Sequence, residues 1–188
     1  DVYKRQPQTL APADVMVGGG VKWMRAGWGS GILAVSARAL DRLEPTLTGW
    51  FGVEGFLDLA TPVPHEPRDD AERMREGSPS IYGAVAFAAA IDAIEVAGLA
   101  AIQATIRTLV LELEEALNRV GAEVLTPWRS EAERSGILSF RMPDEDPTET
   151  TSRMADAGLT VSERHGWVRL SPHATTDPAV VDVLEGLL

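Results

Sequence analysis

The chain has 188 residues, of which 45% are hydrophobic and 24% are charged, so it can bury a core and we expect a globular protein of one large or two small units. Its formal net charge of -11 at pH 7 disfavours nucleic acids and anionic membranes as partners, because both attract basic surfaces. No apolar run reaches the roughly 20 residues of a bilayer span, and the start of the chain lacks the apolar core of a signal peptide, so we expect a cytoplasmic protein.

The first third of the chain predicts two short buried strands and a long irregular segment. Residues 14–17 and 31–36 read as the strands, and the glycine-rich stretch GGGVKWMRAGWGS (18–30) connects them. Residues 45–79 are rich in glycine, proline and charge. We therefore expect little regular structure there, as in an excursion over a surface or an interface.

Two helices and a small α/β unit follow. Residues 82–96 are apolar almost all round, which predicts a helix covered on most sides. Residues 99–120 repeat apolar side chains every three or four positions, which predicts an amphipathic helix that Gly121 ends. The remainder alternates between strands and helices, with strands predicted at 137–141, 160–163 and 167–170 and helices predicted at 147–157 and from 178 to the end.

Lysine is rare in this sequence and cysteine is absent. Lys4 and Lys22 are the only lysines, and the missing cysteines exclude disulfides, thiolate metal sites and a cysteine nucleophile in this chain. The three histidines lack metal-ligand spacing, so we expect no metal site. Lys4 lies in a polar segment typical of a frayed end, which leaves Lys22 as the informative lysine.

Lys22 lies among glycines and bulky apolar residues, without an acidic neighbour in the sequence. We expect little water around it, and desolvation favours the neutral, nucleophilic amine. Such an amine can form a Schiff base with an aldehyde, which a guanidinium cannot. The alternative is a surface lysine whose amino group extends into solvent.

The run ADVMVGGGVKWMRAGWGSGILAVS (13–36) resembles the lysine segment of class V aminotransferase-like pyridoxal-phosphate enzymes. Two later segments resemble the same family in the same order. Gly49-Trp50-Phe51-Gly52 is similar to a GW-x-G segment of kynureninase-like members, and residues 76–80 (EGSPS) are similar to a segment that precedes the long helix pair. The resemblance implies that Trp50 and Ser78 lie near the cofactor phosphate, across the interface of a homodimer.

Arg164 and Arg169 form the third candidate group. If His165-Gly166 is a two-residue hairpin turn, Arg164 pairs with Trp167 and Ser162 pairs with Arg169, which puts both arginines on one face. Two guanidinium groups on one face suit a substrate carboxylate. The resemblance implies a carboxylate-binding arginine here, at Arg164 in the desulfurase-like branch and at Arg169 in the kynureninase-like branch, and we favour Arg164. Pairing of both with surface acids is the alternative.

The resemblance implies an α/β fold of the fold-type I pyridoxal-phosphate transferases. Residues 1–80 then form the end of the large cofactor-binding domain, residues 81–121 form connecting helices, and residues 122–188 form the small C-terminal α/β domain. The family's N-terminal half is missing, including the aromatic residue that stacks on the pyridine ring and the aspartate that pairs with its nitrogen. We therefore expect this fragment alone to be inactive.

The expected function is pyridoxal-phosphate chemistry on a small amino acid, with Lys22 as the Schiff-base lysine and general base. Amino transfer and epimerisation both fit, and a kynureninase-like hydrolase of a C–C bond is the alternative enzyme. Cysteine desulfuration is disfavoured because that branch uses a cysteine after the lysine. A non-catalytic assembly domain is the alternative outside the enzymes, since Val21 stands where the family has histidine or tyrosine.

Overall fold

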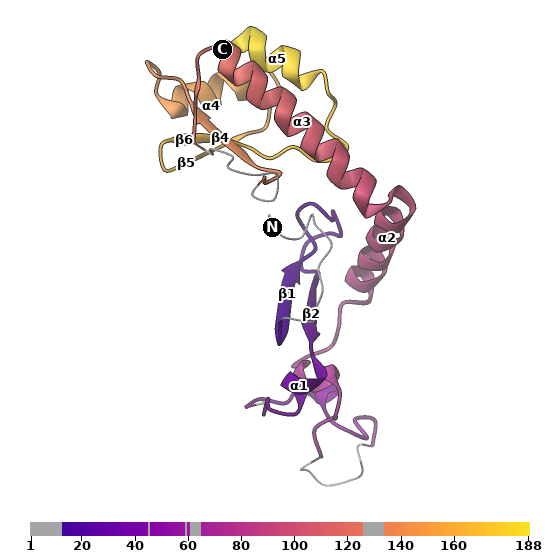
Figure 1. The fold of residues 1–188 in the computed structure, drawn as a ribbon. Helices are drawn as coiled ribbons and strands as arrows, with labels where there is room; N and C mark the ends of the chain where they lie inside the picture. Colours follow the sequence, from indigo (N-terminus) through magenta and orange to yellow (C-terminus); the bar gives the residue numbers. More distant parts are fainter. Residues whose placement is uncertain (1–12, 45, 59, 61–64, 126–133) are drawn as a thin grey trace. The chain divides into compact units, whose positions relative to one another are not determined.

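The computed structural model describes residues 13–44, 46–58, 60, 65–125 and 134–188. The chain divides into two compact units, one ending at Val96 and the other comprising Ala97–Leu188 (Figure 1). The boundary falls inside the region expected to connect two domains, between its two helices. Each unit is therefore built from one of these helices and the elements that pack with it.

An antiparallel hairpin forms the centre of the first unit. Strands β1 (Val15–Gly19) and β2 (Gly31–Val35) pair from Val15 opposite Val35 to Gly19 opposite Gly31. Both strands lie where the sequence predicts them. The expectation that they are buried is wrong for β1, where Val17 is 73% exposed, because no other described strand covers this two-stranded sheet.

Short elements follow the hairpin. Helix α1 (Ala37–Leu40), which the sequence did not predict, begins after Ser36, whose side chain accepts a hydrogen bond from the backbone N–H of Ala39. The irregular segment then contains only short pieces of structure among its described residues: the 3-10 helices η2 (Trp50–Gly52) and η3 (Ala71–Met74) and one bridge between Val53 and Pro67. This confirms the expected lack of regular structure there.

Helix α2 (Ile81–Ala97) closes the first unit. The apolar composition predicted this helix correctly, but the expectation that it is covered on most sides is wrong, because α2 has no buried residue. Tyr82 and Val96 are each 91% exposed. An apolar helix gains its stability from packing, and the described residues supply only part of that packing.

The second unit is a four-stranded antiparallel sheet with three helices. Its strand order is β3-β4-β6-β5. Every predicted strand and helix of this part is present within two residues of its expected ends, whereas the two-residue strand β3 was not predicted. The elements are α3 (Leu99–Arg119), β3 (Glu123–Val124), β4 (Leu138–Arg141), α4 (Pro147–Asp156), β5 (Ser162–Arg164), β6 (Trp167–Leu170) and α5 (Val180–Leu187).

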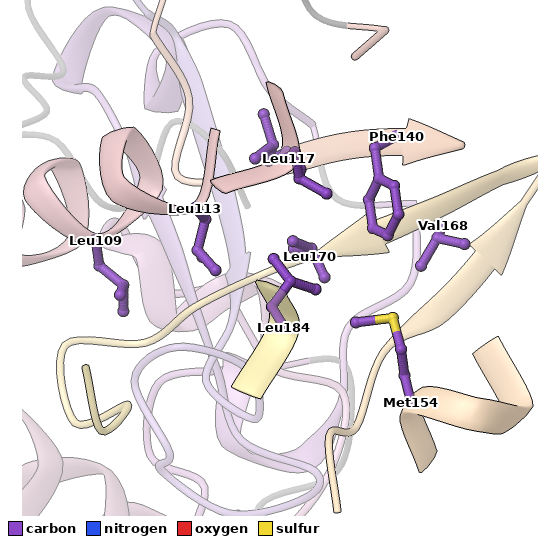
Figure 2. Close-up of a cluster of buried hydrophobic side chains, with 9 residues drawn as sticks. Leu109, Leu113, Leu117, Phe140, Met154, Val168, Leu170 and Leu184 are labelled. Atoms are coloured by element: carbon purple, nitrogen blue, oxygen red, sulfur yellow. The ribbon is translucent and has the colours of Figure 1, made fainter. Parts of the chain in front are cut away.

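The three helices cover one face of this sheet. Buried side chains from α3, α4 and α5 meet alternate residues of the two central strands in a single cluster, which Figure 2 shows. The cluster comprises Leu109, Leu113, Leu117, Leu138, Phe140, Met154, Val168, Leu170 and Leu184. Because strand side chains alternate between faces, Ser139 and Arg169 lie on the opposite face.

Hydropathy gives no single membrane-spanning helix within the described ranges. Helices α2 and α3 reach the required length and apolar character only when the two are counted together, on either side of the break at Gly98. Gly98 has a φ of 79°, a conformation that glycine adopts without strain and that separates the two helices.

Truncation of Phe140 tests the core of the second unit. Its side chain is fully buried, so Phe140→Ala should lower the free energy of unfolding by about 3–5 kcal/mol through lost apolar contacts and a cavity. The matched control is Val183→Ala on α5, where the side chain is 40% exposed and the cost should stay below about 1 kcal/mol. Urea unfolding measures both, and equal costs would contradict the assigned core.

Asp146 gives the second unit a pH-dependent helix cap. Its carboxylate accepts a hydrogen bond from the backbone N–H of Thr148 at 2.7 Å, and this bond lowers the pKa of Asp146. Because the folded pKa lies below the unfolded value, the stabilisation is present above the unfolded pKa and is lost as the pH falls through the folded pKa.

Asp146→Asn keeps a capping acceptor that does not titrate. The melting temperature of the wild type should therefore fall relative to that of Asp146→Asn when the pH drops below the ordinary aspartate pKa of 3.8. Asp146→Ala should be less stable than both at neutral pH. The titrating cap would be contradicted if the melting temperatures of the wild type and of Asp146→Asn differed by the same amount from neutral pH to about pH 2.

Candidate active site

Lys22 lies on a loop that is closed by hydrogen bonds between backbone groups of the loop. The Gly20 N–H donates to the Ser30 carbonyl at 2.8 Å, and the Ala26 N–H donates to the Gly20 carbonyl at 3.0 Å. The Arg25 N–H donates to the Lys22 carbonyl at 3.0 Å, which makes a tight turn at the lysine itself. The connection between β1 and β2 therefore fixes the Lys22 backbone, because its two ends are tied together.

The environment of the Lys22 side chain differs from the sequence-based expectation. The side chain is exposed, so the described residues do not shield it from water as expected. No carboxylate of those residues lies within ion-pair distance of its amino group. Lys22 is thus an accessible amine without an acidic partner in the described part of the chain, on a backbone that is well defined.

The base of the Lys22 loop packs closely against helix α2. A Cβ added at Gly20 would lie 2.7 Å from the Ser30 hydroxyl and 2.8 Å from the Phe87 ring. Only glycine fits this approach without displacing one of them. A cleft of about 370 Å³ lies beside it, lined on one side by the loop and on the other by the first turns of α2; its residues include Gly29, Ser30, Ser80, Gly83 and Phe87.

Trp50 lies in an aromatic cluster and is 54% exposed. Its ring is 5.5 Å from that of Phe51 and 6.5 Å from that of Phe56, measured between centroids. Its indole N–H donates to the Phe56 carbonyl at 2.6 Å. Since this donor is already used, Trp50 has no N–H left for a phosphate in this conformation, and its role here is that of an aromatic anchor.

Ser78 lies in an exposed segment that packs beside the Trp50 segment. A Cβ at Gly49 would overlap the Glu76 backbone, and a Cβ at Gly52 would lie 2.9 Å from the Arg73 carbonyl. The two segments that the resemblance places near a phosphate are therefore adjacent. The Ser78 hydroxyl makes no hydrogen bond with a described residue, and neither Trp50 nor Ser78 hydrogen-bonds to Lys22 within the described ranges.

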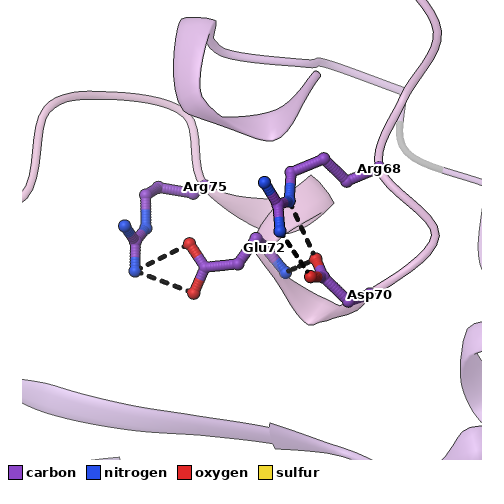
Figure 3. A network of polar contacts seen from close by, with 4 residues as sticks. All are labelled: Arg68, Asp70, Glu72 and Arg75. Carbon is purple, nitrogen blue, oxygen red and sulfur yellow. Dashed lines mark hydrogen bonds and ion pairs between the residues drawn. The ribbon is translucent and has the colours of Figure 1, made fainter. Parts of the chain in front are cut away.

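Charged side chains hold the segment that leads to Ser78, as Figure 3 shows. Arg68 binds Asp70 through two hydrogen bonds, at 3.1 and 2.7 Å, which raise the pKa of Arg68 and lower the pKa of Asp70. Arg75 pairs with Glu72 at 2.8 Å. Exposed pairs of this kind add little stability, but they restrict how the chain can run.

Arg73 fixes the same segment to helix α1 and the residues that follow it in the first unit. Its guanidinium donates to the carbonyls of Leu40 and Leu43, at the end of α1. Sequence reasoning missed Arg73, because nothing in its local sequence shows which distant carbonyl it binds. The charge-rich run at 68–75 was the only available signal.

The second unit places Arg164 and Arg169 as the sequence predicts. Strands β5 and β6 pair with Ser162 opposite Arg169 and Arg164 opposite Trp167, so the prediction that both arginines share one face is confirmed. The turn residues His165 and Gly166 have φ values of 54° and 79°, typical of the two-residue hairpin turn that was expected. Neither arginine pairs with an acid of the described residues, so the alternative of surface ion pairs is wrong for that part of the chain.

The two arginines differ in burial. Arg164 is exposed and Arg169 is partly buried. The Nε atom of Arg169 is buried and has no hydrogen-bond partner among the described residues, which is costly for a charged donor unless a ligand or another group satisfies it. Arg169 therefore has the stronger requirement for an anion, in contrast to the preference for Arg164 drawn from the sequence.

The described residues contain no cluster of three potential metal ligands.

Solved structures show which fold these elements belong to. The apo cysteine desulfurase from Thermococcus onnurineus NA1 is 26% identical, with a TM-score of 0.83 over 93% of this chain and 46% of that chain. A mutant of C-DES with glycine covalently linked to its pyridoxal phosphate cofactor has a TM-score of 0.82 at 17% identity, over 98% of this chain and 49% of that one. The expected fold class, α/β of fold-type I, is confirmed.

Sequence comparison then gives the family. The model of the class-V aminotransferases matches residues 8–174, so the chain belongs to this family. Relatives include a probable cysteine desulfurase of Pyrococcus abyssi, 29% identical over 94% of this chain and 46% of the relative. A kynureninase of Deinococcus radiodurans is 30% identical over 71% of this chain and 33% of its own length. The chain thus spans less than half the length of these relatives.

Gly20→Ala tests the close approach of the lysine loop to α2. The added methyl group has no room beside Phe87 and Ser30, so the loop has to move and the melting temperature should fall by several degrees. Gly19→Ala is the matched control, since a Cβ there has no neighbour within 4 Å. Thermal unfolding followed by circular dichroism measures both, and equal losses would contradict the contact.

Proposed function

We propose that the whole protein is a pyridoxal-phosphate enzyme acting on a small amino acid, with Lys22 as the residue that attaches the cofactor through a Schiff base. The observation that carries the proposal is an accessible amine, without an acidic partner in the described chain, on a loop closed by backbone hydrogen bonds. Family membership supports it, because the class-V family implies pyridoxal phosphate.

The residues present fit this cofactor. Lys22 offers the amine, the glycines of its loop allow close approach of a ligand to the backbone, and Ser78 offers a hydroxyl for the phosphate. Trp50 contributes a ring rather than a hydrogen bond, because its N–H already donates to Phe56. When bound, pyridoxal phosphate supplies a ring that withdraws electrons from the bond broken at the substrate's α-carbon.

The chain's own residues bind substrate and move protons in this proposal. Arg169 binds the α-carboxylate, since its guanidinium has a buried Nε atom without a hydrogen-bond partner in the described part of the chain and a carboxylate accepts two hydrogen bonds from such a group. Lys22 takes the proton from the α-carbon as general base and returns it to the product. Amino transfer and epimerisation both need these two roles.

A kynureninase-like C–C bond hydrolase is the second candidate. The GW-x-G segment around Trp50 and the kynureninase of Deinococcus radiodurans among the relatives favour it. Cysteine desulfuration is disfavoured although other relatives carry that name, because this chain has no cysteine to accept the sulfur.

A homodimer follows from the same proposal. The family resemblance implies that Trp50 and Ser78 lie near the phosphate of a cofactor that is bound across the interface of two copies. Their surroundings are apolar and uncovered, as interfaces require before assembly: Leu47 is 72% exposed and Leu57 is 74% exposed.

The lysine test separates this enzyme from a non-catalytic assembly domain. The whole protein, expressed with its upstream part and supplied with pyridoxal phosphate, should absorb at about 420 nm. Lys22→Ala should lose this band while keeping its circular dichroism spectrum. Lys4→Ala is the control, because it removes the other lysine of the chain and should keep the band. A band unchanged in Lys22→Ala would contradict the proposal.

A further inference from the structure

The face of the second unit's sheet opposite the described helices carries a row of arginines. Arg141 ends β4, Arg169 lies on β6 and Arg164 ends β5. The pairing of Ser139 with Arg169 and of Ser162 with Arg169 puts the neighbouring strands in register around Arg169. The helices occupy the other face, so these three side chains share the face without a helix.

Arg141 already has its partners within the chain. Its Nε atom lies 2.7 Å from the Glu123 carboxylate and its terminal nitrogen lies 2.6 Å from it. Its guanidinium also lies 4.7 Å from the centroid of the Trp167 ring, a cation–π contact. The charge of Arg141 is therefore compensated.

Arg164 and Arg169 remain without compensation in the described part of the chain. Glu163 is the nearest acid in sequence, but it pairs with the buried Val168 on the helix side of the sheet, and its carboxylate accepts a hydrogen bond from the Gly166 N–H at 2.6 Å. The acid beside Arg164 is thus used to close the turn. Two uncompensated cations on one face stand out in a chain with a net charge of -11.

We propose that the substrate carries a second anionic group and belongs to the amino acids with an acidic side chain. This rests on the proposed function, in which Arg169 binds the α-carboxylate. Arg164 then binds the carboxylate of the substrate side chain. The register makes the two arginines diagonal neighbours, with backbones about 7–8 Å apart, so their long side chains can each hold one end of a short diacid.

A single carboxylate bound by both arginines would account less well for the two uncompensated charges on this face. A carboxylate satisfies one guanidinium when it binds in the bidentate geometry, and the second arginine would keep its full charge beside the first. A diacid neutralises both charges at once. The partly buried Arg169 then binds the α-carboxylate, next to the reacting α-carbon of the substrate. The exposed Arg164 selects substrates with an acidic side chain.

Binding of succinate and butyrate to the complete protein tests this substrate class. The two ligands have the same number of carbon atoms and differ by one carboxylate. Calorimetry should give a dissociation constant about ten-fold or more lower for succinate. Arg164→Gln should raise the dissociation constant of succinate until it is close to that of butyrate. The dissociation constant of butyrate itself should not change. Arg169→Gln should weaken the binding of both ligands.

Arg141→Gln is the matched control. It removes one positive charge from the same face, as Arg164→Gln does, but Arg141 is held by Glu123, so the preference for succinate should persist. Equal binding of the two ligands by the wild type, a preference unchanged in Arg164→Gln, or no binding of either ligand would overturn the inference. Absorbance of the same samples reports the cofactor, so selective succinate binding by a protein that holds no cofactor contradicts only the proposed function.

Discussion

The close approach of the Gly20 backbone to the Phe87 ring is the constraint on which the position of the Lys22 loop depends. It joins the loop that carries Lys22 to helix α2, and it leaves no room for a side chain at Gly20. The backbone bonds from Gly20 to Ser30 and from Ala26 to Gly20 then close the loop. The lysine is consequently presented by a fixed backbone while its own side chain stays accessible.

The second unit separates stability from recognition by using the two faces of one sheet. The face toward the helices is apolar and buried, and Phe140 is among its fully buried side chains. The opposite face holds the charges, and among the residues that the structure describes an ion pair neutralises Arg141 but neither Arg164 nor Arg169. Under the proposed function, the side chains that recognise substrate are therefore supported by the core of the same strands, since neighbouring residues of β6 alternate between the two roles.

Sequence alone predicted the parts of this structure that local chemistry determines. The β5–β6 register followed from a two-residue turn at His165-Gly166, and the lysine loop followed from its glycines. Strand β3 and the partners of Arg141 and Arg73 were missed, because they depend on contacts between residues far apart in sequence. The exposure of α2 and of Lys22 was not predicted either. An apolar sequence shows that burial would stabilise a segment, but it does not show whether the described residues bury it.

Identification of the residue that holds the cofactor tests the central claim most directly. The complete protein is supplied with pyridoxal phosphate, reduced with borohydride, digested and examined by mass spectrometry. We expect the cofactor mass on the peptide that contains Lys22, in close to one copy per chain. Reduction that places the cofactor on another lysine, or leaves Lys22 unmodified, would contradict the account.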